Sequence, residues 1–285
     1  MILVTGGTGT TGSEIVRQLS AAGARVRVLA RNPEKASAFE KLGVEIVAGD
    51  LDRADTLDAA LDGVESALLL AGNTTQQVEA ESNFIAAAKR AATRHVVKLS
   101  AIGADVKSPV MILRWHGEVE KRLEESGVPF THLRPSFFMQ NMLWSAQTIA
   151  TQGAFYLPLK DAKVGMVDVR DIAAVAVKTL TERGHEGKKY VITGPEALSF
   201  GDVAEKISAA TGKKVTYVDV APEEYKKGAL QAGQPEWVVD AVLELYKLLI
   251  TEGALVTNVV AEVARKQPIT FDQFARDHAQ AFQGK

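Results

Sequence analysis

Residues 1–12 read MILVTGGTGTTG and join a short apolar strand to the start of an amphipathic helix. The run Ile2 to Thr5 has the character of a buried strand, and 13–22 follow with apolar residues at helical spacing. The glycines between them let backbone N–H groups approach a pyrophosphate, toward which the helix turns its positive end. An ordinary glycine turn is the alternative, but the flanking strand and helix favour a dinucleotide site. The residues expected to line this site are Gly6, Thr8, Gly9, Thr10, Thr11 and Gly12.

The composition is that of a soluble globular protein, with 46% hydrophobic and 24% charged residues. A net charge of -2 gives no basic surface for nucleic acid. The absence of cysteine excludes disulfides, thiolate metal sites and cysteine nucleophiles. The expected strand begins directly after Met1, and no apolar run reaches the roughly 18 to 20 residues that span a bilayer. We therefore expect a cytoplasmic protein without a membrane partner.

Short apolar runs alternate with helical segments along the first half of the chain, which is typical of parallel β-α-β units. The expected strands cover 24–30, 44–48, 66–71, 95–100 and 130–133. The expected helices between them cover 33–42, 55–61, 77–92 and 116–126. This alternation predicts an α/β fold of Rossmann type, a doubly wound parallel sheet with helices on both faces. Ligands of such sheets bind beyond the carboxyl ends of the strands.

After Pro135 the alternation loosens into a mixed pattern of helices and short strands. Ser199 and Thr270 have the character of helix N-caps. A length of 285 residues favours one main domain with a smaller one beside it. We predict an NADP-binding Rossmann domain at 1–150, with a returning segment at about 164–195, and a small C-terminal α/β substrate domain at 151–285. The basic residues Lys178, Arg183, Lys188 and Lys189 are interpreted as solvated surface.

Arg31 indicates which nucleotide is bound. NAD-preferring sites place a carboxylate about 20 residues beyond the glycine turn, whereas here Arg31 follows Gly12 by 19 positions and Lys35 comes one helical turn later. A guanidinium pairs with a 2′-phosphate, which a carboxylate would repel. The alternative is that both side chains are solvated charges on a loop. The pattern favours NADPH.

Two further strand ends offer groups for the rest of a dinucleotide. Asp50 can accept a hydrogen bond from the adenine amino group while Leu51 covers the ring, although Asp50 is equally suited to a helix N-cap. Leu70, Ala71 and Gly72 end the next strand, where small residues let the ribose and the pyrophosphate approach the backbone.

The helix after the fifth strand lacks the Tyr-x-x-x-Lys pair of short-chain dehydrogenases, in which the tyrosine donates a proton and the lysine lowers its pKa. Ile112 and His116 occupy the two places instead. No tyrosine is therefore available on this helix as the acid.

Several motifs together resemble the NmrA-like branch of atypical short-chain dehydrogenases, above all its bacterial members related to triphenylmethane reductase and NADPH quinone oxidoreductase. The motifs lie at 5–12, 30–32, 49–51, 99–100, 116–123, 127–138 and 167–173. The likeness covers nearly the whole chain and implies an NADP-binding Rossmann domain with a small C-terminal substrate domain. It also implies a histidine in place of the usual lysine, here His116, so the missing tyrosine is a family trait. Family members divide into reductases and redox sensors.

The resemblance implies roles for individual residues. His116 would hold the nicotinamide ribose and Ser100 would face the nicotinamide, which makes these two the candidate catalytic residues. A buried core histidine and a strand-end serine are the alternatives. Pro135, Ser136 and Phe137 would place backbone around the carboxamide and one face of the cofactor.

Aromatic and apolar side chains after residue 135 are candidates for the wall of an aromatic substrate pocket, with plain core as the alternative. They are Phe137, Phe138, Met139, Met142 and Trp144, joined from the second domain by Tyr156, Trp237 and Tyr246. Asp168 and Asp171 resemble a metal pair superficially, but carboxylates favour helix N-termini. The five histidines show no ligand spacing, so we expect no metal.

These observations predict an NADPH-dependent reductase that passes hydride to a planar, electron-poor acceptor such as a quinone, an azo compound or a triphenylmethane-type dye. Such acceptors take hydride readily, so positioning supplies much of the rate, with the proton from water or with help from Ser100 or His116. A non-catalytic NADP(H) sensor that binds a regulatory protein is the alternative. Reduction or isomerisation of a natural-product intermediate is a third hypothesis. A second copy of the chain is a further expected partner.

Overall fold

A seven-stranded parallel sheet in the order β3-β2-β1-β4-β5-β6-β9 organises the first part of the structure, a computed structural model that describes residues 1–252 and 254–285. The strands are β1 (Ile2–Val4), β2 (Val26–Ala30), β3 (Glu45–Ala48), β4 (Ser66–Leu69), β5 (His95–Leu99), β6 (Phe130–Pro135) and β9 (Lys188–Ile192). Every pairing within this sheet is parallel. The order changes direction at β1, which confirms the predicted doubly wound Rossmann sheet.

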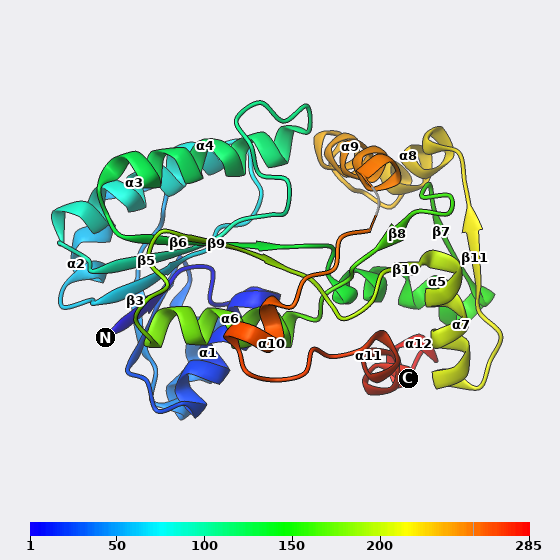
Figure 1. Ribbon diagram of the computed structural model, residues 1–285, viewed down its shortest axis with the longest axis horizontal. Helices are drawn as coiled ribbons and strands as arrows, with labels where there is room; N and C mark the ends of the chain where they lie inside the picture. Colours follow the sequence, from blue (N-terminus) through cyan, green and yellow to red (C-terminus); the bar gives the residue numbers. More distant parts are fainter. Residues whose placement is uncertain (253) are drawn as a thin grey trace. The chain divides into compact units, whose positions relative to one another are not determined.

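Helices cover both faces of this sheet (Figure 1). One face carries α1 (Thr10–Ala21), α6 (Val169–Thr181) and α10 (Val259–Val263), and the other carries α2 (Leu57–Leu61), α3 (Gln77–Arg90) and α4 (Met111–Ser126). The large apolar residues buried on α1 recur at helical spacing and face the sheet: Ile15, Val16 and Leu19. Helix α4 ends where Gly127 takes up a left-handed conformation with φ 81°.

Two predicted helices of this part are 3-10 segments wholly or in part. The segment η1 (Pro33–Leu42) is 3-10 throughout, and its buried residues, Ala36 and Phe39, are three positions apart, which matches three residues per turn. The short η2 (Ala54–Thr56) precedes α2. Both segments have little apolar surface to bury.

The chain divides into two compact units. Unit 1 contains the sheet and consists of Met1–Pro135, Val169–Ile192 and Val259–Lys266, while unit 2 consists of Ser136–Asp168, Thr193–Asn258 and Gln267–Lys285. The predicted division placed 136–150 in the first domain. In the structure, Met139, Met142 and Ile149 are buried in the hydrophobic core of unit 2, which is why this segment belongs there. The return of Val259–Lys266 to unit 1 has no counterpart in the prediction.

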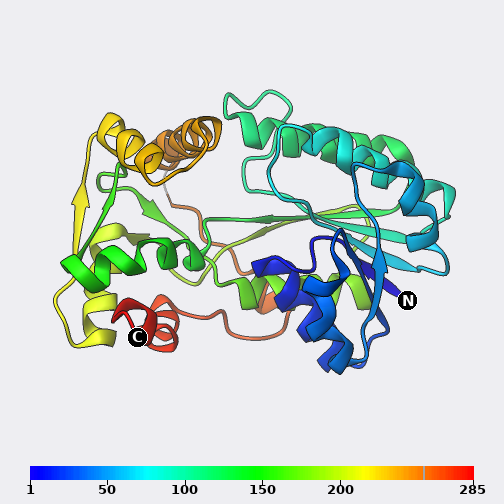
Figure 2. The ribbon, with the colours of Figure 1, turned by 180° about the vertical axis from the view of Figure 1, so that it is seen from behind.

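Unit 2 contains two small sheets and a set of helices (Figure 2). Antiparallel β8 (Lys163–Val164) and β10 (Leu198–Ser199) form one sheet, and parallel β7 (Ala154–Leu157) and β11 (Thr216–Asp219) form the other. The helical segments are η3 (Met139–Ser145), α5 (Ala146–Gln152), α7 (Phe200–Thr211), α8 (Pro222–Gln231), α9 (Glu236–Glu252), α11 (Phe271–Asp277) and α12 (Ala279–Phe282). Ser199 and Thr270 cap α7 and α11 through their side chains, as the sequence predicts. None of the described helices combines the length and the apolar character that crossing a bilayer requires.

Candidate functional site

The glycine turn between β1 and α1 contains glycines that the protein itself requires. Gly6 has φ +63°, a conformation that side-chain-bearing residues rarely adopt. A Cβ on Gly12 would lie 2.1 Å from the backbone oxygen of Gly6, so a side chain there cannot be accommodated without moving the turn. These two residues shape the turn and bring the helix against it.

Gly9 has a different reason to lack a side chain. Its backbone is extended, with φ -83° and ψ 172°, and the nearest atom to an added Cβ is the Gly6 oxygen at 3.4 Å, an ordinary contact. Neither the backbone nor the packing therefore demands glycine at this exposed position. A ligand that must approach the backbone does demand it, and the turn fits a pyrophosphate in this respect.

The N-terminus of α1 is open to an anion. Gly9 is its N-cap and supplies no side-chain hydrogen bond, and the first turn carries no acidic residue. The positive end of the helix dipole and the first N–H groups are thus uncompensated by the helix itself. Thr8 and Thr10 are exposed beside them, whereas Thr11 is buried. This combination is typical of a phosphate-binding helix start.

Arg31 and Lys35 lie just beyond the carboxyl end of β2, and both are exposed. Among the described residues neither side chain forms a hydrogen bond or an ion pair, and the loop is held by Asn32. Asn32 accepts a hydrogen bond from the Glu34 N–H at 3.0 Å and caps η1. The Arg31 guanidinium is consequently free to meet a 2′-phosphate.

The other predicted nucleotide residues also lie at strand ends. Asp50 accepts a hydrogen bond from the Asp52 N–H at 3.2 Å, and the N-cap of η2 is Arg53, so Asp50 does not cap a helix. Leu51 and Leu70 are half-buried, and Gly72 is exposed with open space where a Cβ would stand. The turn is tied to this edge because Thr5 Oγ1 accepts from the Leu70 N–H at 2.8 Å.

His116 lies on α4 inside a buried polar cluster that the sequence analysis did not predict. Its Nδ1 is 3.3 Å from Lys98 Nζ and 3.4 Å from Gln77 Nε2. Lys98 in turn forms an ion pair with Glu81 on α3 at 2.9 Å. Burial, together with the charge of Lys98, lowers the pKa of His116 well below 6.5, so the imidazole is neutral at physiological pH.

Ser100 follows β5 and is buried, with its backbone N–H bound to the Leu133 oxygen at 2.7 Å. Its hydroxyl contributes to the lowered pKa of Glu120 but makes no hydrogen bond of full geometry among the described residues. Pro135 ends β6 and accepts from the Ile102 N–H at 3.0 Å. Ser136 is buried at the next position.

A second ionic cluster lies on α4 and β6. Glu120, Glu124 and His132 have ligand atoms within 4.8 Å of one another. Cations already satisfy the carboxylates, because Arg134 Nε is 2.9 Å from Glu120 and Lys189 Nζ is 2.7 Å from Glu124. Lys189 is exposed, as predicted, and its ammonium group also pairs with Glu124. Burial lowers the pKa of His132 to about 4 despite the two carboxylates.

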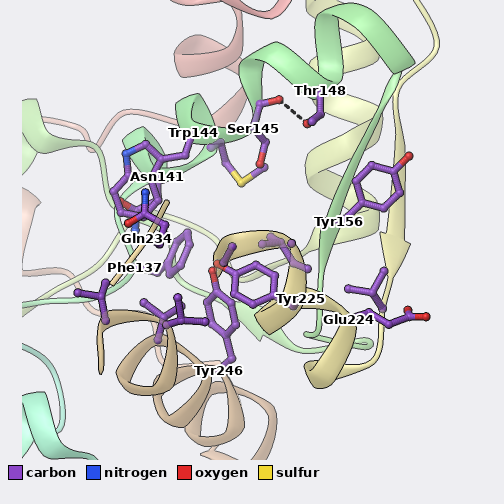
Figure 3. A pocket seen from close by; sticks show the side chains of 18 residues that line it. Phe137, Asn141, Trp144, Ser145, Thr148, Tyr156, Glu224, Tyr225, Gln234 and Tyr246 are labelled. Atoms are coloured by element: carbon purple, nitrogen blue, oxygen red, sulfur yellow. Dashed lines mark hydrogen bonds between the residues drawn. The ribbon is translucent and has the colours of Figure 1, made fainter. Parts of the chain in front are cut away.

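Unit 2 contains a cavity of about 880 Å³ with five aromatic residues in its wall (Figure 3). Five of the predicted pocket residues line it, namely Phe137, Met142, Trp144, Tyr156 and Tyr246. The segment that carries Phe137 is held by backbone pairing with Val167, which donates to the Phe137 oxygen at 2.9 Å. Trp144 is 79% exposed, so its ring is available at the cavity and is not packed in the core.

Three predicted pocket residues do not line this cavity. Met139 is buried in the core of unit 2, and Phe138 pairs its backbone with Val167. Trp237 stands nine positions before Tyr246 on α9, which at about 100° per residue places it half a turn away. Other side chains complete the wall: Asn141, Glu224, Tyr225, Gln234, Val238, Val239 and Val242. Most of these residues lie on α8 and α9, and the amphipathic pattern of these helices is shared by ordinary core helices.

Comparison with known proteins identifies the family of this chain. The profile of the NmrA-like family matches residues 1–275. The chain belongs to the NmrA-like family. It is 45% identical to an NAD(P)H azoreductase of Xenophilus azovorans, with 99% of each chain covered.

Two solved structures extend this likeness within the NmrA-like fold. An NADPH-dependent quinone oxidoreductase of Escherichia coli, in complex with NADPH, is 27% identical with a TM-score of 0.88 over 97% of this chain and 99% of that one. A triphenylmethane reductase of Citrobacter sp., in complex with NADP(H), is 25% identical with a TM-score of 0.87 over 98% and 99%. The predicted family resemblance is thereby confirmed.

Proposed function

We propose that this NmrA-like protein is an NADPH-dependent reductase that transfers hydride to a planar, electron-poor aromatic acceptor of the quinone, azo or triphenylmethane type. The observation that carries the proposal is the aromatic cavity of unit 2. A nucleotide site is equally expected in a reductase and in a redox sensor, whereas an open aromatic cavity is needed only where a second ligand binds. The relatives are named as an azoreductase, a quinone oxidoreductase and a triphenylmethane reductase. Their names support an acceptor of the same class for this chain.

The residues of unit 1 fit NADPH part by part. The backbone at Gly9 and the start of α1 would hold the pyrophosphate, and Arg31 with Lys35 would pair with the 2′-phosphate. Asp50 and Leu51 would meet the adenine, and His116 the nicotinamide ribose. Leu70, Ala71 and Gly72 would allow the ribose and pyrophosphate near the backbone. Ser100 and Pro135, with Ser136 and Phe137 that follow Pro135 in the chain at the start of unit 2, would surround the nicotinamide.

Hydride transfer to such an acceptor requires little from the side chains beyond binding the cofactor and the acceptor. NADPH supplies the hydride when it is bound, and a quinone or dye cation accepts it without prior protonation. His116 is neutral and therefore a hydrogen-bond donor rather than a strong acid. The proton that completes reduction of a quinone or azo group comes from water. Holding the acceptor ring in a fixed orientation is then the main contribution of the cavity.

The charge of the cavity favours some acceptors over others. Glu224 is the charged side chain among its described lining residues, and no lysine or arginine stands with it. Phe137, Tyr225 and Tyr246 present π faces, which attract cations. We therefore expect neutral quinones and cationic dyes to bind better than sulfonated, anionic azo dyes.

Stopped-flow measurement of NADPH absorbance against quinones, azo dyes and triphenylmethane dyes tests this function. We expect rapid NADPH oxidation with at least one class, and acceptor KM roughly 10-fold higher in Gly228→Trp, since Gly228 lines the cavity and has open space at its Cβ position. Gly228→Ala is the matched control and should behave as the unaltered protein. Flat traces throughout would contradict the reductase and favour the NADP(H) sensor, which binds the cofactor without consuming it.

A cytoplasmic location and a homodimeric or regulatory partner are further parts of the proposal. Light scattering of the purified protein, with and without NADPH, measures the oligomeric state directly. A mass twice that of the 30.6 kDa chain would support the homodimer, and the mass of one chain would contradict it.

A further inference from the structure

A fully buried ion pair in unit 1 stands beside the proposed catalytic histidine. Lys98 on β5 and Glu81 on α3 have no exposed side-chain surface, and their charged atoms are 2.9 Å apart. A buried ion pair of this kind is often no more stabilising than apolar residues of the same volume. Its presence in a strand that is buried throughout, HVVKL, therefore calls for a role other than stability.

The hydrogen bonds of Lys98 determine where the proton of His116 lies. An ammonium group has three N–H donors and no acceptor. Lys98 Nζ has three partners within reach: the Glu81 carboxylate, the Leu99 oxygen at 2.7 Å and His116 Nδ1 at 3.3 Å. Because Lys98 can only donate, Nδ1 must accept, and the ring proton is on Nε2. The conclusion does not depend on which way the Gln77 amide is turned.

The opposite nitrogen of the ring is left for a ligand. In the described part of the chain His116 Nε2 has no hydrogen-bond partner, even though the residue is buried, with 7% of its surface exposed. A neutral imidazole with its proton on Nε2 is a fixed donor, suited to a hydroxyl group of a ribose.

We propose that Lys98 and Glu81 are positioning residues that hold His116 in the neutral Nε2–H form, so that it donates a hydrogen bond to the cofactor ribose and does not act as a general acid. This inference rests on the proposed function, in which His116 meets the nicotinamide ribose. Glu81 holds the Lys98 ammonium group in place through their ion pair, and Lys98 keeps Nδ1 unprotonated. The charged groups that face His116 are Lys98 from β5 and, behind it, Glu81 from α3.

The charges of the cluster agree with this arrangement. The positive charge of Lys98 and the burial of the ring both oppose a second proton on His116, and its pKa is lowered accordingly. Burial raises the pKa of Glu81 while Lys98 opposes that rise. The rate of NADPH oxidation should therefore show no step between pH 5.5 and 8 that disappears in His116→Gln.

Nitrogen-15 NMR of histidine-labelled protein tests the proposal without any need for turnover. The resonances of His116, assigned by their loss in His116→Gln, should show the Nε2–H form at pH 7 and keep it at pH 5.5. The double variant Lys98→Met/Glu81→Leu replaces both charges with apolar side chains of similar volume, so it leaves no unpaired buried charge. In this double variant we expect a mixture of the two neutral forms of His116 and a Kd for NADPH about 10-fold weaker. Adding His116→Gln to the double variant should not weaken NADPH binding further.

Lys266→Met is the matched control, because Lys266 pairs at 2.7 Å with the buried Asp171 on the other face of the sheet. It should leave both the His116 spectrum and NADPH binding unchanged. An Nδ1–H or doubly protonated His116 in the unaltered protein would overturn the inference, as would an unchanged spectrum and Kd in the double variant. If the spectrum is as expected but no acceptor is reduced, the proposed function fails while the assignment of the proton stands.

Discussion

The proposed nucleotide site of unit 1 and the cavity of unit 2 are built in different ways. The first uses backbone groups of one short turn and side chains at the ends of adjacent strands, as at Gly9 and Arg31. The second collects side chains from segments as distant in sequence as Phe137 and Tyr246. A backbone site fixes one ligand shared by a whole family, whereas a side-chain cavity can change its ligand by substitution without disturbing the fold.

Gly12→Ala should produce the largest effect, because the new Cβ would overlap the Gly6 oxygen, 2.1 Å away. We expect a Kd for NADPH weaker by roughly 100-fold or more, about 2.7 kcal/mol, together with lower stability. Fluorescence titration and thermal unfolding measure both. Gly9→Ala sharpens the comparison: its Cβ fits the protein, so stability should be kept while NADPH binding weakens. Equal losses of stability in the two variants would contradict the distinct roles assigned to these glycines.

Arg31→Ala should weaken NADPH binding by roughly 10- to 100-fold, since charge-assisted hydrogen bonds to a phosphate are worth about 1.5 to 3 kcal/mol. NADH binding should be unaffected, and the two Kd values converge. Arg25→Ala is the matched control, because Arg25 is an exposed arginine at the opposite end of β2. Tighter binding of NADH than NADPH by the unaltered protein would refute the assignment of the 2′-phosphate site.

His132 should make the stability of the protein depend on pH under acid conditions. Its pKa falls to about 4 in the folded protein, whereas the unfolded chain takes up this proton near pH 6.5, so stability is present above pH 6.5 and is lost as the pH falls below it. From pH 7 to 5.5 the loss from this residue should be about 1 kcal/mol. Urea unfolding of the unaltered protein and His132→Gln at both pH values measures it. The same pH dependence in the variant would show that His132 does not cause the loss.

Glu224→Gln should have the smallest effect, because the carboxylate is exposed and solvent screens its field. We expect KM for a cationic dye to rise by roughly 3-fold, with KM for a neutral quinone unchanged. Glu223→Gln, on the neighbouring exposed residue that does not line the cavity, is the control. A matching rise for the quinone would show that the change is not one of charge.

The same contrast explains how much the sequence predicts. The glycine turn, Arg31 and the capped helices depend on residues close together in the chain, as where Ser199 caps α7. The cavity depends on tertiary packing, so Phe137 and Trp144 were predicted from their place after β6, whereas Tyr225 and Glu224 were not.

Trp237 shows why the lining of the cavity is hard to predict from the sequence. An aromatic residue is suited to such a pocket, but the position of Trp237 on α9 places it on the side of the helix away from Tyr246. Lys98 did leave a signal, a charge inside a strand expected to be buried on both faces. Its partner Glu81 lies on a helix whose register against the sheet no local pattern fixes.

The crystal structure of the protein with NADP⁺ and a non-reducible aromatic acceptor analogue tests the central claim most directly. The account predicts the 2′-phosphate at Arg31, His116 Nε2 within hydrogen-bond distance of a ribose hydroxyl, and the analogue among Phe137, Trp144 and Tyr225. An analogue bound outside the unit 2 cavity, or a 2′-phosphate away from Arg31, would contradict it.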